Sequence, residues 1–159
     1  MKKTEKIVLT GVFGALIVVF TAYVKIPAVT GYINLGDGFL YTCAGLLGYF
    51  AAIPAAIGSA LADLLAGYPI YIPVTFVVKG FMALFAAYLL KRLPKRWSFI
   101  AFIPPALVMI LGYFIYEWAL YGVMTAGANI VGNCIQGVAG VVVGAILVPI
   151  VTRVKYFQN

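Results

Sequence analysis

Long apolar runs, separated by short polar or proline-containing breaks, fill almost the whole chain. A helix that crosses a bilayer needs about 20 mainly apolar residues. Windows of this length give four clear spans, and a further apolar region at 35–67 is interrupted in its middle by Gly48 and Pro54. We divide that region into two short helices. The pattern therefore predicts an all-α fold, a six-transmembrane-helix bundle that forms a single membrane domain over residues 1–159. The expected helices lie at about 7–24, 35–50, 53–66, 74–90, 99–122 and 130–152.

The basic residues are distributed in a way that predicts the orientation of this bundle. Six crossings place both termini on one side of the membrane, and nine of the 11 lysines and arginines then fall on that side. These nine are Lys2, Lys3, Lys6, Lys91, Arg92, Lys95, Arg96, Arg153 and Lys155. Because cytoplasmic connections carry an excess of lysine and arginine, we expect both termini to be cytoplasmic. The net charge of +7 therefore indicates topology, and we expect no nucleic-acid partner.

Composition supports a membrane location and argues against an enzyme. The chain is 65% hydrophobic and 9% charged, with a mean hydropathy of +1.10, so lipid must solvate most of its surface. It contains no histidine, which removes the commonest general base and zinc ligand. It also has no Gly-x-x-x-x-Gly-Lys loop for nucleotide phosphates, so it does not drive ATP hydrolysis itself. We expect a multi-pass protein of a bacterial cell membrane with no catalytic residue, no metal site and no cofactor.

Charged side chains at membrane depth are costly and need a partner, a cavity or an interfacial position. Asp37 is expected at the start of the second helix, either as a helix cap or, with Asn34, as a group that holds the first outer loop over a pocket. Asp63 and Lys79 are expected at similar depths on the third and fourth helices. A structural ion pair between these two is our first expectation, and direct contact of Lys79 with a polar or anionic substrate is the alternative.

A second set of polar residues predicts a binding face in the outer half of the bundle. Glu117 lies among aromatic residues of the fifth helix, including Tyr113, and Asn129, Asn133 and Gln136 share one face of the sixth. Stacking surfaces with a few directed hydrogen bonds suit a small heteroaromatic solute. The alternative is hydrogen bonding between helices, which amides commonly provide in membranes. Glu117 favours a substrate that donates hydrogen bonds or carries positive charge.

On the first helix, Gly11 and Ala15 are four residues apart and Gly14 adjoins Ala15. They form a smooth strip that another helix can approach closely.

Two motifs make the chain similar to a known family. The outer loop Gly-Tyr-Ile-Asn-Leu-Gly-Asp, from Gly31 to Asp37, and the segment from Gly58 to Pro69 followed by Lys79-Gly80 resemble the S components of energy-coupling factor (ECF) transporters, in the riboflavin-type or hydroxymethylpyrimidine and pyridoxine-type subgroup.

The resemblance implies a vitamin-binding subunit that docks on a transmembrane coupling protein driven by two cytoplasmic ATPase subunits. The family's docking motif on the first helix is alanine-xxx-alanine, and here Gly11 and Ala15 occupy it. The family's substrate region is matched by Asn34, Lys79, Glu117, Asn129 and Asn133. Pyridoxine or hydroxymethylpyrimidine is the favoured substrate. A self-sufficient ion-coupled secondary carrier, with Glu117 or Asp63 as a proton relay, is the alternative function.

Overall fold

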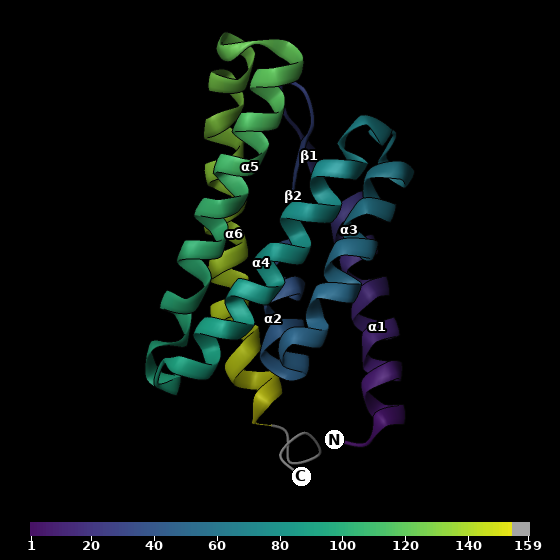
Figure 1. The fold of residues 1–159 in the computed structure, drawn as a ribbon, viewed down its shortest axis with the longest axis vertical. Coiled ribbons are helices and arrows are strands. Elements are labelled where there is room, and N and C mark those ends of the chain that lie inside the picture. Colours follow the sequence, from purple (N-terminus) through teal and green to yellow (C-terminus); the bar gives the residue numbers. More distant parts are fainter. Residues whose placement is uncertain (154–159) are drawn as a thin grey trace.

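The computed structural model describes residues 1–153, and Lys155, one of the basic residues counted above, lies outside the described residues. In this part of the chain, six α-helices account for most of the structure (Figure 1). They are α1 (Lys3–Ala22), α2 (Gly36–Leu47), α3 (Ala52–Ala66), α4 (Ile72–Arg92), α5 (Ile103–Tyr121) and α6 (Val123–Thr152). Three 3-10 helices, η1 (Gly48–Ala51), η2 (Pro69–Tyr71) and η3 (Lys95–Phe102), and two strands, β1 (Lys25–Pro27) and β2 (Tyr32–Asn34), connect them.

The length and composition of these helices are those of a multi-pass membrane protein. Five segments of the described chain are long and apolar enough to cross a bilayer. They are Lys3–Ala22, Gly36–Ala66, Pro69–Arg92, Trp97–Tyr121 and Val123–Thr152. The second of these segments contains both α2 and α3, which have only 12 and 15 residues, and the backbone between them turns at Gly48 with a φ of 58°.

The chain direction alternates from helix to helix. A Cβ at Gly36, the first residue of α2, would meet Thr21 near the end of α1, and the carbonyl of Ala66, the last residue of α3, accepts a hydrogen bond from Lys25. The start of α2 and the end of α3 therefore lie together. In Figure 1, α1 begins and α6 ends at the lower end of the bundle. We call this the basal end. The opposite end, which holds the hairpin of β1 and β2 and the connection between α5 and α6, is the apical end.

The largest difference from an expected helix boundary is at the start of α6, seven residues earlier than expected, whereas the starts of α1 and α5 differ by four residues each. The expected connection at 123–129 is helical, because α6 begins at Val123, directly after Gly122 with its φ of 85°. Five of the seven residues at 123–129 are small or polar, and such residues are compatible with a helix as well as with a loop. The preceding helix α5 begins at Ile103, and Pro104 and Pro105 lie in its first turn, where the missing N–H groups are tolerated.

A short β-hairpin, which the sequence analysis did not predict, occupies the first apical connection. β1 and β2 pair antiparallel with Lys25 opposite Asn34 and Pro27 opposite Tyr32. The hairpin lies above α2, whose 12 residues span only about 18 Å of the roughly 30 Å of a bilayer core. Non-helical backbone at such depth is stable only where its polar groups are paired or protected by protein.

Below the hairpin, α2 and α6 approach closely through glycines. An added Cβ at Gly140 would lie 2.7 Å from the Cβ of Asp37, and one at Gly144 would lie 2.9 Å from the Cβ of Tyr41. A Cβ at Gly38 would clash with Val143. Small residues at a helix interface permit such contact and the dispersion energy that comes with it. This packing fixes the N-terminus of α2 against the middle of α6.

Candidate substrate-binding site

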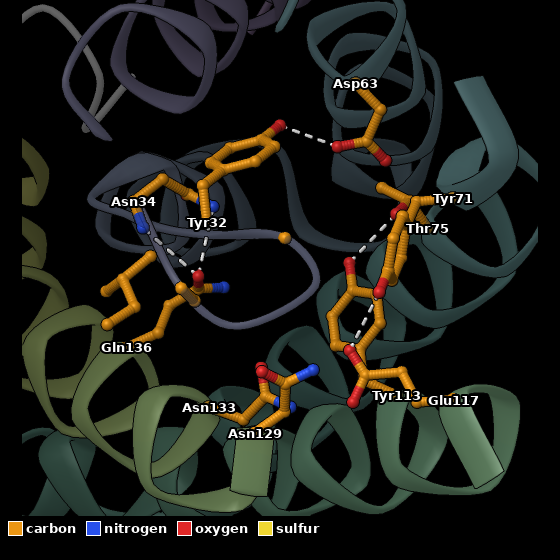
Figure 2. Close-up of a pocket in the computed structure, with 13 residues that line it drawn as sticks. Tyr32, Asn34, Asp63, Tyr71, Thr75, Tyr113, Glu117, Asn129, Asn133 and Gln136 are labelled. Carbon is orange, nitrogen blue, oxygen red and sulfur yellow. Dashed lines mark hydrogen bonds between the residues drawn. The ribbon is translucent and has the colours of Figure 1, made fainter. Parts of the chain in front are cut away.

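A polar pocket with a volume of about 40 Å³ lies at the apical end, between the β-hairpin and the upper parts of α3, α4, α5 and α6 (Figure 2). It is lined by Ala28, Gly31, Tyr32, Ile33, Asn34, Asp63, Tyr71, Thr75, Tyr113, Glu117, Asn129, Asn133 and Gln136. One water molecule needs roughly 10–15 Å³ by a comparable measure, so the pocket holds only a few waters in this conformation.

Hydrogen bonds around Gln136 form the floor of the pocket. Its side-chain oxygen accepts from the backbone N–H and the side-chain amide of Asn34, each at 3.1 Å, and its Nε2 donates to Asp37 Oδ2 at 2.9 Å. The Asn34 Oδ1 in turn accepts from the backbone N–H of Gly36 at 3.0 Å. Asn34 thus holds the first N–H of α2, and Gln136 on α6 links the hairpin to α2.

Beneath this floor, Lys79 on α4 pairs with Asp37 on α2. The Lys79 Nζ lies 2.5 Å from Asp37 Oδ1, and its side chain is 2% exposed. The expected ion pair between Asp63 and Lys79 is therefore wrong. Thr75, which lines the pocket with Asp63, is one helical turn, about 5.4 Å, above Lys79 on α4, and the Lys79 side chain extends towards Asp37 on α2 instead of α3.

Asp63 forms one wall of the pocket together with the hairpin. Its Oδ1 accepts a hydrogen bond of 2.6 Å from the hydroxyl of Tyr32, a contact visible at the top of Figure 2. Burial and the neighbouring Asp63 carboxylate raise the pKa of the Tyr32 phenol well above its usual range, so the hydroxyl keeps its proton and remains a donor. The contact joins strand β2 of the hairpin, which covers the pocket, to α3.

Glu117 forms the opposite wall, on α5. Its Oε1 lies 3.0 Å from the Tyr71 hydroxyl and 3.3 Å from Oγ1 of Thr30, which both have a proton to donate. The side-chain amide of Asn129 also donates to Thr30. A second hydroxyl pair, Thr75 and Tyr113 at 2.9 Å, lies deeper between α4 and α5. Thr30 therefore closes the hairpin onto α5 and α6.

Four buried polar atoms that face this pocket have no hydrogen-bond partner among the described residues. They are Asp63 Oδ2, Glu117 Oε2, Asn129 Oδ1 and Asn133 Nδ2. Three of them accept hydrogen bonds and one donates. Buried polar groups are rarely left unpaired, because each costs about 1–3 kcal/mol. The lining residues that the structure describes include two carboxyl groups, Asp63 and Glu117, and no lysine or arginine, so any formal charge that the lining carries is negative.

The sequence predicted six of the lining residues, namely Asn34, Tyr113, Glu117, Asn129, Asn133 and Gln136. Two other candidates, Asp37 and Lys79, do not line the pocket and lie under its floor. Lining residues that the prediction missed include Tyr32, Tyr71 and Thr75. The tyrosines follow helix ends, where an interfacial anchor is the usual interpretation, and only their hydroxyl contacts across the bundle distinguish them.

The candidate docking residues on α1 do not all face the same way. Gly11 and Ala15 are exposed on the outer surface of α1, and an added Cβ at Gly11 would have nothing within 4 Å. Gly14 faces α3, where an added Cβ would lie 3.6 Å from the Cβ of Pro54. The smooth exposed strip therefore consists of Gly11 and Ala15.

Comparisons with known proteins agree on one family. The family model for the S component of ECF-type riboflavin transporters matches residues 1–153. An uncharacterized protein encoded in the 3′ region of gap in Pyrococcus woesei is 32% identical over 123 residues, which cover 76% of this chain and 82% of that protein. The thiamine precursor transporter HmpT of Lactococcus lactis is 28% identical over 156 residues, which cover 96% of this chain and 90% of that protein.

Proposed function

Because this chain belongs to the family of ECF-type riboflavin transporter S components, we propose that it is a single membrane domain that captures a small water-soluble vitamin or vitamin precursor in the apical pocket. Delivery then requires an ATP-driven module made of a transmembrane coupling protein and two ATPase subunits. The observation that carries the proposal is the set of four unpaired polar atoms in that pocket, because they are available to a solute.

The chemistry of these atoms favours a neutral or cationic heterocycle over an anion. Three unpaired acceptors and one unpaired donor suit a ring that carries an amino group, a hydroxyl group and a ring nitrogen. Hydroxymethylpyrimidine has this combination, and pyridoxine offers hydroxyl groups with a ring nitrogen that can be protonated. The tyrosines at 32, 71 and 113 supply aromatic surface beside them. The name of the Lactococcus lactis relative, a thiamine precursor transporter, supports a vitamin precursor as the substrate.

Capture of a solute requires the β-hairpin to move away from the pocket. The present volume of about 40 Å³ is too small for a substituted six-membered ring. The hairpin closes the pocket through the Tyr32 contact with Asp63 and the Thr30 contact with Glu117. These carboxylates are the groups that the substrate would engage, so an entering solute can replace both hairpin contacts with its own donors.

The distribution of charge supports an outward-facing pocket. Lys3, Lys6, Lys91 and Arg92 lie on elements that begin or end at the basal end, whereas the pocket is apical. A cytoplasmic basal end follows the positive-inside bias and places the pocket outside. The exposed strip of Gly11 and Ala15 on α1 is then the surface for the coupling protein.

A thermal-shift screen of the detergent-purified chain tests this function. The panel is pyridoxine, hydroxymethylpyrimidine, thiamin, riboflavin, pantothenate, folate, biotin and cobalamin. Binding to the native state alone adds about 2.7 kcal/mol of stability at one hundred times the dissociation constant. We expect a shift with pyridoxine or hydroxymethylpyrimidine and none with the anionic vitamins pantothenate, folate and biotin.

The matched variants are Glu117→Gln, in the pocket, and Ile115→Val, on the exposed side of the same helix. A hydrogen bond to a charged group contributes about 1.5–3 kcal/mol, so Glu117→Gln should weaken binding roughly 10- to 150-fold while Ile115→Val leaves it unchanged. Equal affinity of both variants would refute the role of Glu117. Uptake by the isolated chain in proteoliposomes that depends on a proton gradient would instead support the ion-coupled carrier.

A further inference from the structure

The outer surface between α3 and α4 contains an apolar groove of about 370 Å³, which shares no lining residue with the substrate pocket. Its walls include Ile53 and Ile57 on α3 and Phe76 and Phe81 on α4, all about half exposed. Its floor is Gly80, where an added Cβ would lie 3.4 Å from the Cβ of Ala56. The absence of a side chain at Gly80 leaves room for an extended hydrocarbon chain between the two helices.

The groove is distinguished from ordinary lipid-facing surface by what lies at its basal end. The wall on α3 begins directly after η1, and each of the two aromatic rings of η1 lies beside the ammonium group of a lysine. Lys91 Nζ lies 3.9 Å from the ring centroid of Tyr49, and Lys6 Nζ lies 5.1 Å from that of Phe50. Aromatic rings hold these ammonium groups in place without neutralising their charge.

A third cation, Arg92, lies at the basal end of α4, the helix that forms the other wall of the groove. Tyr88 lies one turn beyond Leu84 on the same face, and the guanidinium of Arg92 lies 4.5 Å from the Tyr88 ring centroid. An arginine that is oriented by an aromatic ring keeps its hydrogen-bond donors available for a phosphate.

Acidic residues are nearly absent from this end of the molecule. The chain has four, and three of them, Asp37, Asp63 and Glu117, lie in or beneath the apical pocket. The remaining one, Glu5 on α1, accepts a hydrogen bond from the backbone N–H of Lys2, the residue that precedes this helix. The elements that adjoin the basal end of the groove, η1 and the last turns of α4, therefore hold an excess of positive charge.

We propose that the groove between α3 and α4 is a binding site for an anionic phospholipid. One acyl chain lies between the two helices, and the phosphate is held by Lys6, Lys91 and Arg92. The apolar groove accommodates the acyl chain, and the three cations complement the negative charge of the headgroup. The lipid comes from the leaflet that contacts the basal end, which is the cytoplasmic leaflet in the proposed orientation.

Native mass spectrometry and thermal shift with added dioleoyl lipids test this site. The detergent-purified chain is titrated with phosphatidylglycerol and, separately, with phosphatidylcholine of the same acyl chains. We expect phosphatidylglycerol to remain bound and to raise the melting temperature, and phosphatidylcholine to do neither. Equal retention of the two lipids would overturn the proposal.

Three variants separate a specific site from general attraction. Lys6→Gln with Lys91→Gln removes two charges at the groove and should weaken phosphatidylglycerol binding at least tenfold. The control, Lys2→Gln with Lys3→Gln, removes two charges at the start of α1 and should leave binding within twofold. Ile53→Trp should weaken binding by filling the groove, with all cations retained.

Two results would count against the site. Equal losses in the groove and control double variants would mean that only net charge matters. Loss of assembly with the coupling protein in Ile53→Trp, with lipid binding unchanged, would identify the groove as a protein interface. Neither outcome bears on the vitamin screen, since the apical pocket is not altered by these substitutions.

Discussion

Removing one or both charges of the buried ion pair under the pocket tests whether Lys79 contacts the substrate or stabilises the fold. The perturbation is Lys79→Gln or Asp37→Asn alone, compared with both substitutions together. Each single change leaves one charge buried without its partner, because the lysine Nζ and the Asp37 carboxylate are 2.5 Å apart and almost fully enclosed. Breaking a buried pair in this way typically costs about 3–5 kcal/mol, whereas replacing both charges is often nearly neutral.

The expected size of the effect is large enough to measure. For a chain of this length, 1 kcal/mol shifts the melting temperature by roughly 2–4 °C, so each single variant should melt about 6–20 °C below the parent. The double variant should recover most of that loss, because an asparagine at position 37 can still accept the hydrogen bond from Gln136. Intrinsic fluorescence of the two tryptophans in detergent follows unfolding of all four proteins.

The ligand affinity of the double variant is the second measurement in this test. Neither Lys79 nor Asp37 lines the pocket, so the double variant should bind the ligand found in the vitamin screen within about threefold of the parent. Single variants that each cost less than about 1 kcal/mol would refute the proposed importance of the pair. A stable double variant that no longer binds would show that Lys79 contacts the substrate, which was the alternative expectation.

Three further predictions follow from individual contacts. Tyr32→Phe removes the donor to Asp63 that closes the free pocket, so it should increase the rate of ligand association, measured by stopped-flow fluorescence, with a change of less than about 1 kcal/mol in stability; an unchanged association rate would count against a closing role of this contact. Gly38→Ala places a methyl group in the contact between α2 and α6 and should destabilise the chain by about 1–3 kcal/mol in thermal unfolding. The control Gly127→Ala places its methyl group in open space and should not, so equal effects of the two substitutions would refute the packing argument. Gly11→Leu should prevent copurification with the coupling protein and leave vitamin binding intact, and unchanged copurification would exclude this strip as the docking surface.

The helical parts of the fold could be predicted because hydropathy averages over many residues. Spans near α3 and α4 are displaced by only one or two residues from the expected 53–66 and 74–90. The hairpin could not be predicted, because three-residue strands carry almost no periodic signal and the segment 25–34 has the composition of an ordinary loop. The start of α6 was missed for a similar reason, since helix and loop are not distinguished by polarity alone.

The candidate site shows where sequence spacing stops being informative. Asn129, Asn133 and Gln136 share one face of α6, and helical periodicity was sufficient to predict it. The partner of Lys79 depended on which way its long side chain turns between α2 and α3. Depth along a helix axis does not specify that direction, and the short α2 brings Asp37 to an unexpected level in the bundle.

The short α2 helix with a hairpin above it divides the molecule into two parts of unequal local stability. In the basal part, glycine packing and a buried ion pair join α2, α4 and α6, so their amide protons should exchange with solvent only when the whole bundle unfolds. The hairpin backbone is held by three-residue strands and a few side chains, and its amides should exchange through local opening. In the proposed function, admission of a solute requires local opening of only the segment 25–34, while every long helix keeps its hydrogen bonds.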